Sequence, residues 1–414
     1  MILRNKRYSS EIVQIRGEYY EFADSLCDLP IIDALHLLRN SQYEPVDPLP
    51  KFDPESWIKE RKIVWDGPFG ANNGFGNFSE QMMLALSKLC DVYPLDTWNL
   101  VNSHPEAYDP QTLKLFEKPL DRLDTFYLKV SLLHDYEPTY QDYKIAFTMF
   151  ETTHLPKERP PQINQYKHCF VPCDHNLEVF RNSGVTVPLS KIPLGFNPDY
   201  YSYIDRPIKS KDEPFVFGIF GGLTRRKGVT ESVEAFRQEF TNGENVRLIN
   251  HNVNPVVHGW EYGDERIEYN LVNWGAKDLV KNFLAKIDVG VFPTKGEGWG
   301  MPPMETAATG APIIVTDWSG PSEYAGNHRD KFLLLDATTE PVFDFPFEWG
   351  YLGDWAKVDI RQLRKQMRWA YENRIEAHAM GKKASDYLHA EYTWQKSAQK
   401  LVDRLDQLAE KAHG

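Results

Sequence analysis

The chain of 414 residues is longer than one hydrophobic core usually serves, so two domains are expected. Its apolar content of 42% and charged content of 26% are ordinary for a soluble globular protein, and its net charge of −12 argues against a large interface with nucleic acid or an anionic membrane. No apolar stretch reaches the roughly 18–20 residues that span a bilayer, the first residues lack the apolar segment of a secretory signal, and four cysteines are too few for a disulfide framework. The composition therefore predicts a soluble, cytoplasmic protein.

The first 60 residues alternate charged residues with short apolar patterns of helical period, of which 31–38 is the clearest. We interpret 1–60 as a helical extension that packs on the first domain. It contains no motif that indicates a chemical function.

The first domain is expected over 61–207. A short strand at 62–65 leads into a glycine-rich loop that ends with Gly74 and Gly76, and an amphipathic helix follows at 80–89. Such glycines let backbone N–H groups approach a ligand closely, but they suit a tight turn under a packed helix equally well. Further strands are predicted at 98–102, 126–133, 143–150 and 169–171.

Polar residues directly follow the strands predicted at 98–102, 126–133 and 143–150. His134 comes after one strand, and Glu151 and His154 come after the next. Ligands bind parallel sheets at the carboxyl ends of the strands, so these three residues are the candidate catalytic groups of the first domain.

A cluster of cysteine and histidine at 168–175 contains the residue types of a zinc site. Cys169 lies in a predicted buried strand, however, where neighbouring side chains alternate between faces and cannot converge on one ion. We therefore expect no metal site.

A second α/β domain is expected over 208–384, because the charged, proline-containing segment 205–214 has the character of a linker. Its first strand, 215–220, runs into two glycines and the basic run from Arg225 to Lys227, and a helix follows at 229–240. Further strands are predicted at 246–250, 267–272, 289–292, 311–316 and 332–335. The last segment, 385–414, has the apolar face of a helix that packs back on the first domain.

The segment 286–325 is the most informative part of the chain. It predicts a strand, a glycine-rich turn, a helix and a second strand, with Glu297 on the turn and Glu305 about one turn inside the helix. A diphosphate suits the helix start and the nearby cations Arg226 and Lys227, and Glu305 could accept hydrogen bonds from a ribose diol.

These motifs occur in the order found in retaining glycosyltransferases of family 4, which the chain resembles over 61 to about 400. The most specific match is the run from Glu297 to Thr316, which resembles the Glu-x7-Glu signature of that family and its downstream Ala-x-x-Gly-x-Pro. The resemblance implies a GT-B fold, in which two Rossmann-like parallel-sheet domains face each other across a cleft. It also implies a nucleotide-sugar donor, most commonly a UDP- or GDP-sugar, a hydroxyl acceptor, and no further cofactor or metal.

The resemblance assigns roles to particular residues. Glu297 would contact the transferred sugar, Glu305 the ribose, and Lys227 the leaving diphosphate. The other donor-binding residues would be Gly74, Gly76, Arg226, Gly298, Trp299, Gly300 and Met301.

Two positions depart from the family pattern. Gly222 stands where the family carries an arginine five residues before its lysine, a charge that Arg226 or Arg225 could supply. No single residue corresponds to the catalytic histidine of the family's first domain, and we rank Glu151 and His134 above His154.

Other functions on this fold stay open. A sugar-nucleotide epimerase or phosphorylase, a phage-type DNA-base glycosyltransferase, and a sugar-nucleotide-binding protein without turnover all fit the same motifs. The net charge argues against the DNA-base glycosyltransferase, and the presence of both Glu297 and Glu305 argues against a binding protein without turnover.

Overall fold

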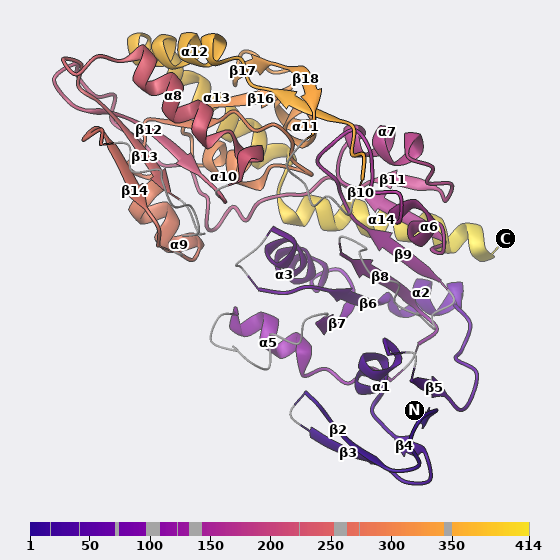
Figure 1. The fold of residues 1–414 in the computed structure, drawn as a ribbon. Helices are drawn as coiled ribbons and strands as arrows, with labels where there is room; N and C mark the ends of the chain where they lie inside the picture. Colours follow the sequence, from indigo (N-terminus) through magenta and orange to yellow (C-terminus); the bar gives the residue numbers. More distant parts are fainter. Residues whose placement is uncertain are drawn as a thin grey trace.

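The computed structural model describes residues 1–16, 18–40, 42–70, 74–96, 108–121, 123–131, 143–222, 224–251, 263–272, 274–342 and 350–413. The predicted strand at 98–102 and the candidate catalytic residue His134 lie outside these residues. Figure 1 shows two sheet domains, with an N-terminal extension beyond the first.

The first domain contains a six-stranded sheet in the order β11-β10-β9-β8-β6-β7, and every neighbouring pair is parallel. The strands are β6 (Lys62–Gly67), β7 (Asp91–Asp96), β8 (Phe126–Val130), β9 (Lys144–Phe147), β10 (His168–Val171) and β11 (Leu189–Lys191). The associated helices are α3 (Gly74–Leu86), α5 (Pro110–Phe116), α6 (Arg159–Ile163) and α7 (Asp174–Asn182). All five residues of β8 are buried, as expected for a parallel strand covered on both faces.

The second domain repeats this architecture, with a parallel sheet in the order β14-β13-β12-β15-β16-β17. The strands are β12 (Phe215–Phe220), β13 (Val246–His251), β14 (Ile267–Asn270), β15 (Val289–Phe292), β16 (Ile313–Asp317) and β17 (Leu333–Asp336). The helices are α8 (Val229–Glu239), α9 (Ala276–Leu279) with a π-helical continuation (Val280–Leu284), α10 (Met301–Ala308), α11 (Gly320–Ala325) and α12 (Ile360–Glu372). The strand order reverses between β12 and β15, which is where such sheets bind ligands. The prediction of two α/β domains with parallel sheets is confirmed.

The prediction of a helical N-terminal extension is wrong. Five short strands form it together with α1 (Ile31–Leu38) and α2 (Pro54–Glu60): β1 (Ile2–Asn5), β2 (Glu11–Ile15), β3 (Glu18–Phe22), β4 (Leu26–Asp28) and β5 (Tyr43–Pro45). β2 and β3 pair as an antiparallel hairpin, and in β2 burial alternates from residue to residue. Such alternation is typical of a half-buried strand and differs from the helical period on which the prediction was based.

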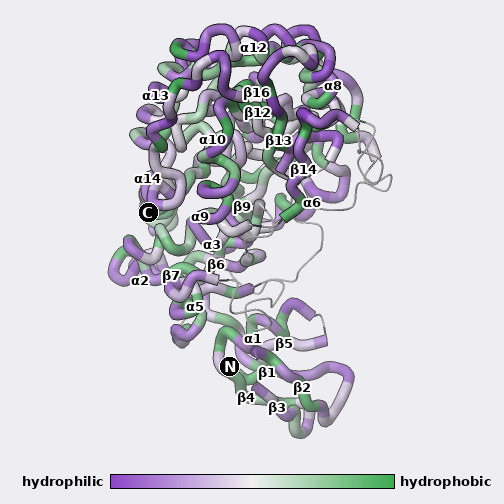
Figure 2. The backbone as a smooth tube through the Cα atoms, turned by 90° about the vertical axis from the view of Figure 1, so that its left-hand side faces the viewer, coloured by the Kyte–Doolittle hydropathy of each residue, from purple (hydrophilic) through white to green (hydrophobic). Residues whose placement is uncertain are grey.

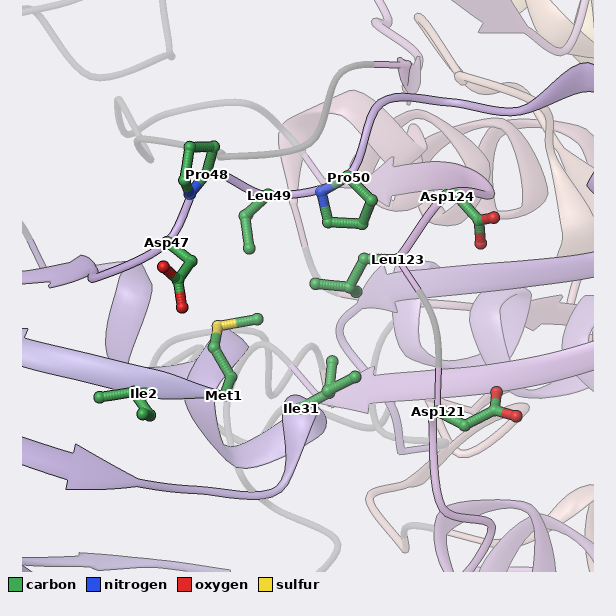
Figure 3. Close-up of a pocket in the computed structure, with 10 residues that line it drawn as sticks. All are labelled: Met1, Ile2, Ile31, Asp47, Pro48, Leu49, Pro50, Asp121, Leu123 and Asp124. Atoms are coloured by element: carbon green, nitrogen blue, oxygen red, sulfur yellow. The ribbon is translucent and has the colours of Figure 1, made fainter.

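The extension covers one face of the first sheet. Its buried residues, among them Leu3, Leu35 and Leu38, share a hydrophobic cluster with Val64 of β6 and Tyr127 of β8. Figure 2 shows it at the end of the molecule away from α12. A cavity of about 360 Å³ lies between the extension and the first domain, lined partly by Met1, Ile31 and Leu123 (Figure 3).

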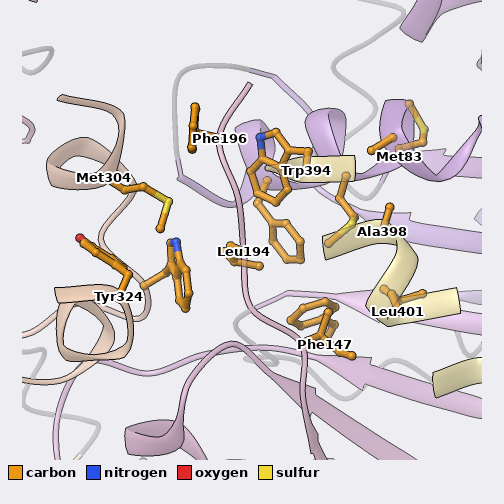
Figure 4. Packing of buried hydrophobic residues seen from close by; sticks show 14 of the residues in the cluster. Met83, Phe147, Leu194, Phe196, Met304, Tyr324, Trp394, Ala398 and Leu401 are labelled. Atoms are coloured by element: carbon orange, nitrogen blue, oxygen red, sulfur yellow. The ribbon is translucent and has the colours of Figure 1, made fainter. Parts of the chain in front are cut away.

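The C-terminal helices connect the two domains. α13 (Arg374–Glu391) packs against α10, and α14 (Trp394–His413) packs against α2 and α3 of the first half of the chain. One hydrophobic cluster continues from Met83 of α3 and Trp394 of α14 through Phe196 to Met304 of α10 (Figure 4). The two domains therefore share a core where they meet.

A further antiparallel hairpin, β18 (Thr338–Pro341) with β19 (Asp354–Lys357), follows β17. The sequence did not predict it, because these strands are short and Thr338–Pro341 contains no large apolar residue.

Candidate active site

Two helix starts, one from each domain, face each other. A Cβ atom built on Gly74, the first residue of α3, would lie 3.5 Å from Cε of Met301, the first residue of α10. Asn77 Nδ2 lies 3.8 Å from Met301 Sδ. A Cβ atom on Gly76 would overlap the carbonyl oxygen of Gly70, so only glycine fits there. Gly74 and Gly76, predicted to lie in a loop before a helix at 80–89, thus lie in the first turn of α3. This turn meets the start of α10 across one crevice, with the positive end of each helix dipole directed towards it.

The Glu297 carboxylate holds two cations. Lys227 Nζ donates to Oε1 at 2.6 Å, and Arg226 Nη1 donates to Oε2 at 2.9 Å. Burial would raise the pKa of Glu297, but the charges and hydrogen bonds of Lys227 and Arg226 outweigh burial and lower that pKa. Glu297 is therefore ionised at neutral pH.

Backbone geometry places the two cations. They lie on a 3-10 turn (Arg225–Lys227) that follows β12 and ends at Gly228, whose φ is +67°. A Cβ atom on Gly228 would overlap the carbonyl oxygen of Pro293, which brings this turn against the loop that carries Glu297. Arg226 and Lys227 are partly buried at the site, whereas Arg225 is exposed. Arg226 is therefore, with Lys227, the second cation that pairs with Glu297.

Of the three first-domain candidates, Glu151 lies in the site. Its Oε1 is 3.6 Å from Nη2 of Arg226, and a Cβ atom on Gly296 would overlap its carbonyl oxygen. The ring of His154 lies instead against Tyr351, with centroids 5.3 Å apart. His134 is outside the described residues.

Glu305 is 5% exposed and faces the crevice from α10. Burial raises its pKa to about 7, against the lowering effect of hydrogen bonds from Tyr201 and Asn77. Beside it lies a cavity of about 280 Å³, lined by residues of both domains that include Glu80, Tyr200 and Lys277. Glu305 therefore lines a cavity between the two domains.

Gly298, Trp299 and Gly300, also predicted to bind the donor, place no large side chain in the crevice. A Cβ atom on Gly298 would lie 2.5 Å from Met149 Cγ, and Gly300 caps α10 with a φ of +92°. The Trp299 side chain is 2% exposed and packs on Tyr324 and Tyr392. Its indole therefore belongs to the core.

Sequence reasoning missed Ser319, Asn77 and Tyr201. Ser319 Oγ accepts the backbone N–H of Glu297 at 2.9 Å, and Ser319 has a φ of +55°, which is unusual for a residue other than glycine. The sequence offered one signal for this turn, the Ser-Gly-Pro run at 319–321. Nothing near Asn77 or Tyr201 in the sequence links them to Glu305.

Within the described ranges, no three or more His, Cys, Asp and Glu side chains gather in a way that could hold a metal ion. Likewise, none of the helices described there is both long and apolar enough to cross a membrane.

Comparison with known families gives a match at this site. Residues 214–342 match the model of the family described as glycosyl transferases group 1. This segment is similar to a glycosyltransferase domain. It contains Arg226, Lys227, Glu297 and Glu305, the residues around which the site is built.

Two curated proteins also match part of the chain. A candidate glycosyltransferase, number 45, of the Sulfolobus islandicus filamentous virus is 26% identical over 151 residues, which is 36% of this chain and 40% of that protein. The capsular polysaccharide biosynthesis glycosyltransferase CapM of Staphylococcus aureus is 27% identical over 135 residues, 30% of this chain and 34% of that protein. The matched segments thus span well under half of each relative.

Solved structures match nearly the whole fold. Sucrose-phosphate synthase from Thermosynechococcus elongatus has a TM-score of 0.59 and 14% identity, covering 84% of this chain and 98% of that one. Anabaena HepE, in complex with UDP and glucose, has a TM-score of 0.55 and 13% identity, covering 84% and 99%. With its two facing parallel-sheet domains, the protein has the GT-B fold.

Proposed function

We propose that the protein is a retaining glycosyltransferase that moves a sugar from a nucleoside diphosphate sugar to a hydroxyl acceptor on a glycan, a lipid or a small molecule. The observation that carries the proposal is the cluster of Glu297, Lys227 and Arg226 between two opposed helix starts. The glycosyltransferase domain match over the same residues supports it. We also propose that the protein lies in the cytoplasm and uses nucleotide sugars there as donors.

The donor diphosphate would lie against Lys227, Arg226 and the N–H groups at the start of α10. During transfer the bond between the anomeric carbon and the phosphate oxygen breaks, and its electron pair stays on the diphosphate. Fixed cations and N–H dipoles stabilise that charge without reorganising. The acceptor oxygen bonds to the anomeric carbon, and its proton leaves with the diphosphate or passes to a carboxylate.

In this proposal the three carboxylates have different roles. Glu297 accepts hydrogen bonds from the hydroxyls of the transferred sugar, and Glu305 accepts those of the ribose. Glu151, held near Arg226 from the first domain, faces the anomeric centre, where its negative charge stabilises the positive charge that develops. The donor is a UDP- or GDP-sugar, and UDP is favoured because one of the similar structures, Anabaena HepE, is a complex with UDP and glucose.

Glu297→Gln tests the site with little change of shape. Release of nucleoside diphosphate from the donor, with and without acceptor, should fall by about 100-fold or more, because the variant cannot hold both cations in place. Glu239→Gln is the control, since Glu239 also pairs with two arginines, Arg364 and Arg368, but on α8 rather than on a loop of the site. Equal rates for wild type and Glu297→Gln would show that the site is wrongly assigned.

A further inference from the structure

The β18–β19 hairpin follows the second sheet in the chain but also binds the first domain. Leu352, just before β19, is 3% exposed and lies in a hydrophobic cluster with Phe150, Leu155 and Phe180 of the first domain. Val342, just after β18, packs against the same cluster. The hairpin is thus anchored in the opposite domain by apolar side chains.

Backbone hydrogen bonds fix the register of this contact. Thr153 N–H donates to the carbonyl of Asp354 at 3.0 Å, and His154 N–H donates to the carbonyl of Leu352 at 3.1 Å. In return, Asp354 N–H donates to Oγ1 of Thr153 at 2.7 Å. These bonds hold the first-domain loop at Thr153, which is two residues after Glu151.

The same hairpin holds the loop that carries Glu297. Ala356 N–H donates to the carbonyl of Lys295 at 2.7 Å, and Lys295 Nζ lies 2.9 Å from Glu340 of β18. The Lys295 ammonium also lies 5.4 Å from the centroid of the Trp355 ring. One short hairpin therefore contacts both loops of the site, two residues from Glu151 on one side and two residues from Glu297 on the other.

We propose that the β18–β19 hairpin is a positioning element that keeps Glu151 in register with Arg226 and Glu297, with Leu352 and Asp354 as its positioning residues. This inference rests on the proposed function, because it assigns the hairpin a role in sugar transfer. The groups assigned to the diphosphate and the ribose, Lys227 and Glu305, lie on the second domain. Loosening the hairpin should therefore impair the chemical step while leaving donor binding largely intact.

Two glycines of the hairpin provide a matched pair of variants. Gly350 and Gly353 both have a φ of +72°, so alanine introduces the same backbone strain at each. A Cβ atom on Gly353 would overlap Thr153 Oγ1 and lie 2.8 Å from His154 Nδ1, whereas a Cβ atom on Gly350 meets no atom of the described residues within 4 Å. Gly353→Ala therefore separates the hairpin from the Glu151 loop, and Gly350→Ala does not.

The experiment measures nucleoside diphosphate release and amide hydrogen exchange in the full-length variants. Relative to Gly350→Ala, Gly353→Ala should lower kcat by roughly 10- to 100-fold with little change in donor KM, because a displacement of about 1 Å in a catalytic group has effects of this size. Exchange at the amides of Thr153 and His154 should rise in Gly353→Ala and not in Gly350→Ala. Leu352→Ala, which removes the apolar anchor, should shift both quantities in the same direction.

Equal kcat values for the two glycine variants, or equal exchange at Thr153 and His154, would overturn the inference. A parallel loss of kcat and donor affinity would also overturn it, since that pattern indicates general destabilisation. The proposed function can fail separately. If wild type released no nucleoside diphosphate from any donor, the exchange data would still show whether the hairpin holds the loop.

Discussion

Lys227 Nζ lies 2.6 Å from Oε1 of Glu297, although the two residues belong to different loops and are separated by 70 positions in the chain. Both side chains are largely buried. The carboxylate thus keeps the cations in place, so the diphosphate of the proposed donor would bind with little reorganisation of these side chains.

Replacing Lys227 by methionine, which keeps the length of the side chain, should lower kcat for donor turnover by about 10²–10³-fold. The affinity for a nucleoside diphosphate should fall, and the affinity for the corresponding nucleoside should not, because only the diphosphate uses this charge. Titration calorimetry with both ligands checks the difference. Lys382→Met, which removes a lysine that pairs with Asp386 on α13, is the control. Equal weakening for nucleoside and diphosphate would contradict the assigned contact.

Donor affinity should depend on pH through Glu305, whose pKa is raised to about 7 by burial. A ribose diol donates more strongly to an ionised carboxylate, so nucleotide affinity should increase as the pH rises through about 7. Glu305→Gln should bind more weakly and lose this increase. A 2′,3′-dideoxy nucleotide should show no such increase with wild type, and an unchanged pH profile in Glu305→Gln would contradict the ribose contact.

The Glu305 carboxyl group should also make the stability of the folded protein depend on pH, and this stability should fall as the pH rises. Since the pKa of Glu305 is higher in the folded state than its ordinary value of 4.5, its stabilising contribution is complete below pH 4.5 and is lost as the pH rises through about 7. Denaturant unfolding of the ligand-free protein should show a smaller loss of stability over that range for Glu305→Gln than for wild type. Parallel curves would show that the carboxyl group is not buried as described.

Ser319→Gly should destabilise the protein less than Ser319→Ala. Both variants lose the hydroxyl that accepts the Glu297 N–H, but only glycine relieves the strain of a φ of +55°. The free energy of unfolding of Ser319→Gly should exceed that of Ser319→Ala by about 1 kcal/mol. A more stable alanine variant would show that the turn is not strained.

The N-terminal extension is joined to the first sheet by a buried ion pair. Arg39 Nη2 lies 2.5 Å from Asp66 Oδ1, and Lys129 Nζ lies 3.2 Å from Oδ2 of the same fully buried carboxylate. Burial would raise the pKa of Asp66, but Arg39 and Lys129 outweigh it and lower that pKa to about 2. The stability that this group contributes is therefore present above pH 3.8 and is lost as the pH falls through about 2.

Asp66→Asn should destabilise the protein by about 3–5 kcal/mol, because it removes one partner of a buried ion pair and leaves two cations without their carboxylate. Asp121→Asn removes an exposed partner of Lys62 and should change stability by less than about 0.5 kcal/mol. Denaturant unfolding at neutral pH measures both. Equal effects would mean that the Asp66 pairing does not hold the extension on the sheet.

The sequence predicted most strands of the parallel sheets, because these are continuous apolar runs that end in glycine or polar loops, but it did not predict β7 or β11. The predicted strands at 215–220 and 289–292 coincide with β12 and β15. The N-terminal strands and the β18–β19 hairpin were missed, since each is short and is stabilised by pairing with residues distant in the chain. The contacts of Glu151 with Arg226 and of Tyr201 with Glu305 could not be predicted, because they depend on how the domains dock.

The most direct test of the proposed function is a donor screen with analysis of the product. The wild-type protein is incubated with UDP-, GDP- and ADP-sugars and candidate hydroxyl acceptors, and nucleoside diphosphate release and the anomeric configuration of the product are followed by NMR. We expect one donor to release its nucleoside diphosphate and to give a product with the anomeric configuration of the donor. Inverted configuration would contradict retention, and interconversion of sugar nucleotides without release of nucleoside diphosphate would contradict glycosyl transfer itself.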